Sequence, residues 1–288
     1  MFEAPESPYL VPFDGSFLMG AAPTAPPDGA PKKSKLQGAL QASVRKLDAL
    51  QQELYADDRW GVLLVFQAMD AAGKDSTIRA VLRGINPQGC QVFSFKQPSS
   101  EELDHDFLWR VAKRLPERGC IGVFNRSHYE EVLVVRVNPG YLAAQKLPRG
   151  IPLEELWAER FESIVHFERH VARSGFVILK FFLNISRDEQ AERFRRRLDR
   201  PDKNWKFSEG DLDVRKQWGD YMEAYEAALN ATSRPWAPWY AVPADDKAYM
   251  RATVAGIVQE SLESLDLGYP EVDKEERKRL QALRKRIE

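Results

Sequence analysis

Residues 65–77 read VFQAMDAAGKDST, and this stretch decides the fold that the sequence predicts. An apolar run at 62–66 leads into it, and Gly84 and Pro87 end the helical segment that follows, so the order is strand, loop and helix. Where a Gly-Lys pair enters a helix, backbone N–H groups can surround phosphate oxygens while the lysine reaches the outer phosphates. Gly73 and Lys74 therefore predict a phosphate-binding loop, or P-loop.

The loop departs from the usual pattern, Gly-x-x-x-x-Gly-Lys-Ser/Thr, at two positions. Ala68 stands at the first glycine and Asp75 at the hydroxyl position, while the next hydroxyl, Ser76, comes one position late. Asp70, inside the loop, is then the natural alternative ligand for magnesium. The competing interpretation is an ordinary strand-to-helix turn, in which Gly73 relieves crowding and the two aspartates are favourable charges at a helix start.

Further strands and helices alternate along the chain. Apolar runs without alternation indicate strands at 91–95, 121–124, 175–185 and 239–242. Helical patterns separate them at 32–57, 101–113 and 152–173, and a last helix follows the fifth strand. This order predicts a parallel sheet covered on both faces. We therefore expect an α/β P-loop kinase fold, a three-layer sandwich around a five-stranded parallel sheet.

The domain organisation follows from changes in composition. Residues 1–31 are rich in Pro, Gly and Ser without a sustained period, which predicts an arm that is partly disordered or packed over a neighbour. The kinase domain should cover residues 32–270, with helical segments at about 187–230 inserted above the sheet as a lid. We expect residues 271–288 to form a charged C-terminal helix.

Composition and charge limit the classes of protein to which this chain can belong. Its 288 residues, 43% of them hydrophobic, can bury a sizeable core. The formal net charge of −1 argues against general binding to nucleic acid or to a membrane surface. The two cysteines, Cys90 and Cys120, lie in apolar runs and do not suggest a disulfide framework. Since no apolar stretch of spanning length and no signal-peptide pattern is present, we expect a soluble cytoplasmic protein.

Several motifs resemble those of the polyphosphate kinase 2 family, in the order and near the spacing that the family shows. They are Asp70-Ala71-Ala72-Gly73-Lys74, Asn86-Pro87-Gln88-Gly89, Phe95-Lys96-x-Pro98, Asn125-Arg126-Ser127-x-Tyr129-Glu130-Glu131, Ser186-Arg187-Asp188-Glu189-Gln190 and Trp205-Lys206. The resemblance runs from about Lys32 to Leu265 and covers nearly the whole chain.

What the resemblance implies is reversible transfer of a terminal phosphoryl group from inorganic polyphosphate to a nucleotide, on a fold similar to thymidylate kinase. It also implies magnesium as cofactor, with manganese as a substitute, and a homodimer or homotetramer. The family usually has Asp-Arg-Ser where this chain has Asn125-Arg126-Ser127. That departure resembles the subgroup that phosphorylates both AMP and ADP, and GMP and GDP are further candidate acceptors. It also removes a carboxylate metal ligand at position 125, for which Glu130 or Glu131 would compensate.

Phosphoryl transfer needs aligned reactants and neutralised charge more than covalent help from the protein. By resemblance and by this chemistry, the candidate catalytic residues are Asp70, Lys74, Asn125, Arg126 and Glu130. Asp70 would bind magnesium, Lys74 would contact the transferring phosphate, and Arg126 the acceptor phosphate. Asn125 would orient water or metal, and Glu130 would support the metal or the acceptor. The nucleotide site would comprise Asp70, Lys96, Arg126 and Glu130. The alternative for 125–127 is an ordinary helix start with a capping side chain.

The predicted lid carries the sharpest charge asymmetry in the chain. Opposed only by Asp199 and Asp202, the basic residues there are Arg193, Arg195, Arg196, Arg197, Arg200, Lys203 and Lys206. Such clustering in a nearly neutral chain predicts a mobile basic cover for a polyanionic donor. The alternative is a solvated charged helix with local pairs such as Glu189–Arg193. The candidate phosphate-binding residues are Ala71, Ala72, Gly73, Asp75, Ser76, Arg79, Arg83, Arg193, Arg197, Lys203 and Lys206.

Two other functions compete with polyphosphate-dependent transfer. An ATP-dependent nucleotide kinase would need an adenine site for the donor, and no separate sequence feature indicates one. A catalytically inactive module that binds polyphosphate or nucleotide is suggested by Ala68, Asp75 and Asn125. Retention of Asp70, Lys74 and Arg126 together argues against the inactive module.

Overall fold

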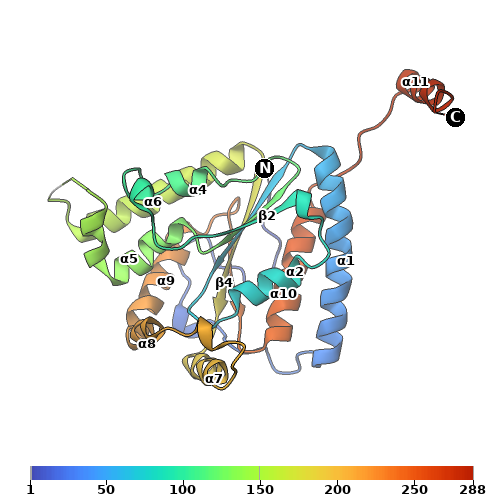
Figure 1. The fold of residues 1–288 in the computed structure, drawn as a ribbon. Helices are drawn as coiled ribbons and strands as arrows, with labels where there is room; N and C mark the ends of the chain where they lie inside the picture. The colour runs from blue at the N-terminus through green and yellow to red at the C-terminus, as the bar shows by residue number, and fades with distance from the viewer. Residues whose placement is uncertain (1, 149, 288) are drawn as a thin grey trace.

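A five-stranded parallel sheet forms the centre of the computed structural model, which describes residues 2–148 and 150–287 (Figure 1). The strands are β1 (Gly61–Gln67), β2 (Cys90–Ser94), β3 (Ile121–Asn125), β4 (Phe176–Asn184) and β5 (Trp239–Pro243). Their order across the sheet is β2-β3-β1-β4-β5, and every neighbouring pair is parallel. The predicted sheet is therefore confirmed.

Helices cover both faces of the sheet, which explains why the middle strands are apolar without alternation. Every residue of β1 is buried, as is every residue of β3 except the last. One face packs against α1 (Lys33–Asp57), α2 (Lys74–Val81) and α10 (Lys247–Glu263), and the other against α6 (Leu153–Arg173) and α9 (Trp218–Thr232) (Figure 1). Phe66 stacks on Phe181 with ring centroids 5.1 Å apart, so aromatic side chains fill the core between β1 and β4.

One predicted helix is wrong in its extent. Where the sequence predicts a single helix at 101–113, the structure has α3 (Ser100–Leu103) and α4 (Trp109–Ala112). Ser99 and Glu102 form a capping box at the start of α3. The Asp106 carboxylate accepts a hydrogen bond from the Leu108 N–H at 2.9 Å, so this side chain competes for the backbone that a continuous helix would need.

The N-terminal arm packs on the molecule's own sheet. The Val11 N–H donates to the Trp239 carbonyl at 2.9 Å, and the Ala241 N–H donates to the Tyr9 carbonyl at 2.8 Å. Tyr9 and Val11 are buried there. The arm thus covers the edge of β5, which would otherwise present unpaired backbone groups.

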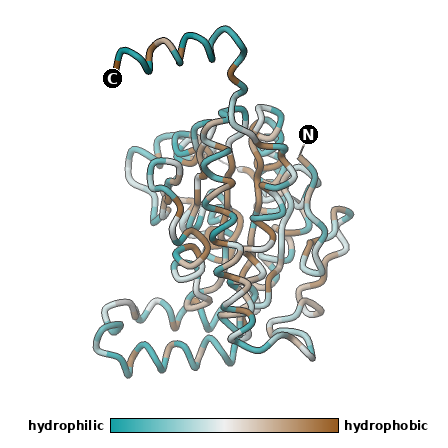
Figure 2. The backbone as a smooth tube through the Cα atoms, turned by 90° about the vertical axis from the view of Figure 1, so that its right-hand side faces the viewer, coloured by the Kyte–Doolittle hydropathy of each residue, from teal (hydrophilic) through white to brown (hydrophobic). Residues whose placement is uncertain are grey.

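The lid hairpin projects below the sheet and consists of α7 (Arg187–Leu198), the turn η5 (Asn204–Lys206) and α8 (Glu209–Lys216). Figure 2 shows a mostly hydrophilic hairpin at this end of the molecule. The helix that follows, α9, buries Tyr221, Ala224 and Tyr225 in the core. The projecting part is therefore shorter than the insertion expected at 187–230.

The last helix, α11 (Lys274–Arg284), stands away from the body of the molecule and buries none of its residues (Figure 1). Three short helical segments connect β3 to α6: the turn η3 (His128–Val132), α5 (Val134–Val137) and the turn η4 (Pro139–Ala144). Within residues 2–148 and 150–287, no helix has the length and apolar character needed to span a membrane.

Candidate active site

A cavity of about 800 Å³ lies at the carboxyl ends of β1, β2 and β3, facing the lid hairpin. Ligands of open α/β sheets bind at this edge, where the loops after parallel strands meet. The cavity brings together twelve of the predicted site residues: Asp70, Ala71, Gly73, Lys74, Asp75, Ser76, Lys96, Asn125, Arg126, Arg193, Arg197 and Lys203. Side chains far apart in the sequence therefore converge on one site.

The P-loop uses left-handed backbone at two positions, Ala71 and Gly73. Gly73 has φ 108°, a conformation that side chains rarely adopt, and it directly precedes α2. Lys74, the first residue of α2, turns its Nζ back onto the loop and donates to the Ala68 carbonyl at 2.6 Å. Burial lowers the pKa of Lys74, and the charge of Asp70 opposes that shift. A phosphate in the cavity would therefore compete with a loop carbonyl for this ammonium group.

Arg126 is the centre of a charged cluster at the end of β3. Its Nη2 lies 3.1 Å from Asp70 Oδ1, and its Nη1 lies 3.7 Å from Glu130 Oε2. The backbone of Arg126 is left-handed, with φ 63°, and its N–H donates to the Phe66 carbonyl, which fixes it beside the P-loop strand. Burial raises the pKa of Glu130, whereas Glu130 and Asp70 together raise the pKa of Arg126.

Asn125 links β3 to the start of α2. Its Nδ2 donates to Asp75 Oδ1 at 2.8 Å. An aspartate at position 125 would place a second carboxylate against Asp75, and such like charges repel. The asparagine and Asp75 are therefore matched to each other in this chain.

Glu131 does not compensate for the missing carboxylate at position 125. It is buried, and its Oε2 accepts hydrogen bonds from Arg160 Nη1 at 3.0 Å and from Gln145 Nε2 at 2.7 Å. Glu131 thus pairs with α6 instead of facing the cavity. Of the two glutamates that the sequence offers, only Glu130 pairs with Arg126.

Arg193 does not have the role that the sequence interpretation gave it. It is 4% exposed, and all five of its N–H donors meet protein acceptors. Nη1 donates to the carbonyls of Ala71 and Ala72 at 3.2 and 2.6 Å. Nη2 donates to the carbonyls of Ala244 and Asp245, and Nε to a carboxylate one turn earlier in α7. Arg193 therefore holds the P-loop from the lid and has no donor left for a phosphate.

Other predicted phosphate contacts lie beside the cavity. Ala72 is fully buried in the loop. Arg79 and Arg83 line a neighbouring hollow of about 400 Å³ that shares Asp75 and Asn125 with the main cavity. The side chain of Lys206 lies outside the described part of the chain.

The sequence interpretation assigned no role to three contributors to the site. Gln190 of α7 is buried and donates from Nε2 to the Asp70 carbonyl at 3.0 Å. Lys247 opens α10 and lines the cavity, and burial lowers its pKa to about 8. Asp211 of α8 lies 3.8 Å from Arg197, and burial, followed by the charge of Asp70, raises its pKa. The only sequence signal for Asp211 was its place at the start of a predicted helix.

The charge of the described cavity lining is strongly unbalanced. Nine basic side chains face three acidic ones, in a chain whose formal net charge is −1. The basic group comprises Lys74, Lys96, Arg126, Arg193, Arg196, Arg197, Arg200, Lys203 and Lys247. A wide, strongly cationic cavity at a P-loop suits a ligand with several phosphates.

Comparison with known proteins places these features in a family context. The sequence profile described as "Polyphosphate kinase 2 (PPK2)" matches residues 31–268. An "ADP-polyphosphate phosphotransferase" from Rhodopseudomonas palustris is 52% identical over 270 residues, which cover 93% of each chain. An "AMP/ADP-polyphosphate phosphotransferase" from Meiothermus ruber is 45% identical and covers 91% of this chain and 95% of its own.

A solved structure agrees with the fold. The crystal structure of polyphosphate kinase 2 from Arthrobacter aurescens superposes with a TM-score of 0.82 at 39% identity, covering 90% of this chain and 89% of the other. Together with the sheet order β2-β3-β1-β4-β5, this likeness confirms the predicted α/β P-loop kinase fold.

Proposed function

The chain belongs to the polyphosphate kinase 2 family, and from that premise we propose that it transfers the terminal phosphoryl group of inorganic polyphosphate to ADP and to AMP. The observation that carries this proposal is the cationic cavity between the P-loop and the lid hairpin. A polyanionic donor needs several positive charges along its length. Helix α7 supplies Arg196 and Arg197 to the cavity, and the turn that follows it supplies Arg200.

The chain's own residues would act by positioning and by electrostatics. Lys74 would leave the Ala68 carbonyl to contact the transferring phosphate, and the P-loop N–H groups would surround its oxygens. Arg126 would neutralise the acceptor phosphate, with Asp70 and Glu130 fixing the direction of its guanidinium group. Since the reaction needs alignment and charge neutralisation more than covalent chemistry, these roles suffice for the protein.

Magnesium is part of the proposal. Among the described residues, no group of three His, Cys, Asp or Glu side chains is placed to hold a metal ion by itself. Mg²⁺ commonly binds one or two carboxylates together with substrate phosphates, and Asp70 offers one carboxylate to the cavity. Asp70 would therefore hold a magnesium ion together with the substrate phosphates, and the ion would supply charge neutralisation at the transferring group.

The choice of acceptor is supported by the relatives and by Asn125. The Rhodopseudomonas protein is named for ADP, and the Meiothermus protein for AMP and ADP. Asn125→Asp would set a carboxylate against Asp75 at the edge of the cavity, so the ratio of AMP to ADP turnover should change. Identical ratios for the variant and the parent chain would remove Asn125 from the explanation.

Turnover of AMP and of ADP, each with magnesium and long-chain polyphosphate but without ATP, tests the proposal directly. Formation of ADP from AMP and of ATP from ADP is the expected result. Activity with ATP as donor but none with polyphosphate would instead favour an ordinary nucleotide kinase. No turnover with either donor would favour a binding module.

A further inference from the structure

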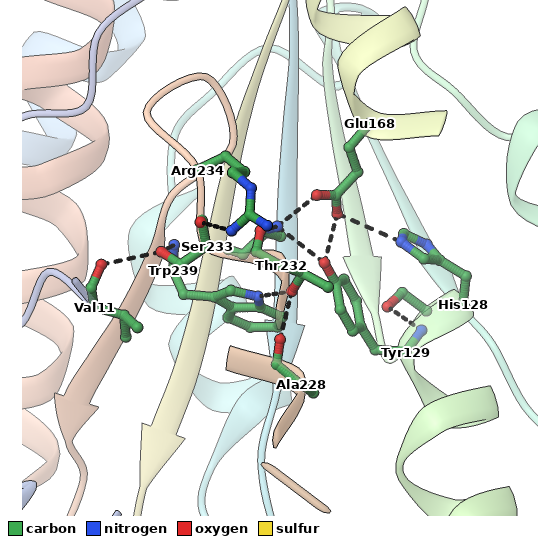
Figure 3. A network of polar contacts seen from close by, with 11 residues as sticks. Val11, His128, Tyr129, Glu168, Ala228, Thr232, Ser233, Arg234 and Trp239 are labelled. Carbon is green, nitrogen blue, oxygen red and sulfur yellow. Dashed lines mark hydrogen bonds and ion pairs between the residues drawn. The ribbon is translucent and has the colours of Figure 1, made fainter. Parts of the chain in front are cut away.

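A buried polar network lies behind the turn η3, which carries Glu130 and follows Arg126. Tyr129 belongs to that turn, and its hydroxyl donates to Glu168 Oε1 of α6 at 2.8 Å. Lys180, in the middle of β4, donates to the Tyr129 hydroxyl at 2.9 Å and to Glu168 Oε2 at 2.5 Å. Figure 3 shows Tyr129, Glu168 and His128 directed toward one another. None of these side chains lines the cavity, so the proposed reaction leaves the network unexplained.

Every donor of Lys180 is engaged. Its third hydrogen bond goes to the Thr232 carbonyl at the end of α9, and the side chain is 0% exposed. Burial lowers the pKa of Lys180 to about 8, so its ammonium form still dominates at pH 7. Burial by itself would raise the pKa of Glu168, but Lys180 and His128 lower it below its ordinary value. The pair is therefore ionised and joins α6, β4, α9 and η3.

A second buried ion pair attaches the same turn to the same helix. Arg160 donates from Nη1 to both the carbonyl and the carboxylate of Glu131, at 2.9 and 3.0 Å. Arg160 and Glu168 are two helical turns apart, so they lie on one face of α6. Residues 129 and 131, on the two sides of Glu130, are thus each fixed to α6.

The two attachments determine where the residue between them points. In a 3₁₀ turn, successive side chains are about 120° apart around the axis. If Tyr129 and Glu131 both point to α6, Glu130 must take the remaining direction, where it pairs with Arg126. The Arg126 backbone, at φ 63°, enters the turn in a conformation that costs energy without such support.

We propose that α6 positions the acceptor site through these two buried attachments, Tyr129–Glu168–Lys180 and Glu131–Arg160. In this view Tyr129, Glu168, Lys180 and Arg160 are positioning residues that act through Arg126 and Glu130. The donor side of the cavity is held separately, by Arg193 of the lid, which donates to the P-loop carbonyls of Ala71 and Ala72. Loosening the α6 attachments should therefore weaken the nucleotide site and spare the polyphosphate site.

Tyr129→Phe tests the inference, because it removes one hydroxyl and keeps the ring packed against Trp239. We expect KM for ADP to rise on the order of tenfold, by analogy with the hydrogen-bond partners that orient metal-binding side chains, whose loss costs about 10–100-fold in affinity. KM for polyphosphate should stay unchanged, and the Kd for ADP from calorimetry should rise with KM. Glu131→Gln, which weakens the second attachment, should change the same parameters in the same direction. The matched control is Ile164→Val, in the core face of α6 between Arg160 and Glu168, which loosens packing without touching either attachment.

The inference rests on the proposed function for its kinetic assay, but the two can fail separately. If the unmodified chain shows no polyphosphate-dependent turnover, the proposed function is wrong. The calorimetric Kd for ADP, compared between the unmodified chain and Tyr129→Phe, then tests the inference by itself. If Tyr129→Phe lowers the thermal midpoint but has the same Kd for ADP as the control Ile164→Val, the network only stabilises the fold. If both KM values rise equally, the attachments do not act on the acceptor site selectively. Either result overturns the inference.

Discussion

Replacing Arg193 with alanine should lower both the stability of the folded protein and its rate of turnover. The guanidinium group donates to four backbone carbonyls at 2.6–3.2 Å and to Glu189 at 2.7 Å, and its side chain is 4% exposed. Breaking a buried ion pair by removing one partner usually costs about 3–5 kcal/mol, because the remaining groups lose their partner without regaining water. For a chain of this size, that cost corresponds to a fall in thermal midpoint on the order of 10 °C.

The same substitution should reduce turnover, because Ala71 and Ala72 lose the donor that fixes their carbonyls. A misplacement of about 1 Å near the reacting atoms can cost roughly a hundredfold in rate, so we expect kcat/KM to fall by about that factor. The assay pairs thermal unfolding with steady-state kinetics. Arg195→Ala is the matched control, since Arg195 lies on the same helix, is 70% exposed and does not line the cavity. Exposed ion pairs add little to stability, so this control should resemble the unmodified chain in both measurements.

A different pattern would refute the reasoning. If Arg193 bound polyphosphate directly, Arg193→Ala would keep its thermal midpoint and lose only affinity for the donor. That loss would be largest at low ionic strength, because salt already screens the attraction at high ionic strength. An unchanged thermal midpoint together with a salt-dependent KM for polyphosphate would therefore restore the phosphate-binding role of Arg193.

Three further substitutions test single contacts. Lys74→Ala should lower kcat by at least about a hundredfold, the usual cost of removing a group that stabilises transferring charge, and retained turnover would contradict its role. Arg197→Ala should raise KM for polyphosphate most at low salt, whereas equal losses at all ionic strengths would exclude an electrostatic contact. Asp211→Asn should raise the thermal midpoint at pH 7, because burial and Asp70 raise the folded pKa of Asp211 above its unfolded value, so its ionisation costs stability as pH rises. The advantage of the asparagine should shrink as pH falls toward 4, and a constant advantage would refute this explanation.

The strands could be predicted from the sequence because their environment is uniform. The run at 62–66 lies between β3 and β4 and under helices on both faces, so each of its positions demands an apolar residue. The P-loop could be predicted equally well, since Gly73 and Lys74 act through local backbone geometry. The apolar run of the strand and the Gly-Lys pair of the P-loop each lie within a few consecutive residues.

Contacts between distant segments could not be predicted in the same way. Arg193 stands in a run of basic residues that is typical of a solvated helix, and only the folded chain brings it to carbonyls about 120 residues earlier. Lys180 did carry a usable signal, because a lysine inside the buried run at 177–183 must find an acidic partner. The identity of that partner, Glu168 of α6, still depends on how this helix crosses the sheet.

Ion pairs within the lid hairpin explain how its cluster of arginines is stable without a bound anion. Its arginines are paired with acids of the hairpin itself: Glu192 with Arg195 and Arg196, Asp202 with Arg200, and Asp211 with Arg197. The cluster is therefore not self-repelling, and its charge alone does not demand a ligand. Most of these pairs are exposed, and such pairs hold weakly. A polyphosphate chain could thus displace Glu192 from Arg196 and Asp202 from Arg200 by breaking only exposed contacts. Arg193, which is buried, would keep the hairpin attached to the P-loop.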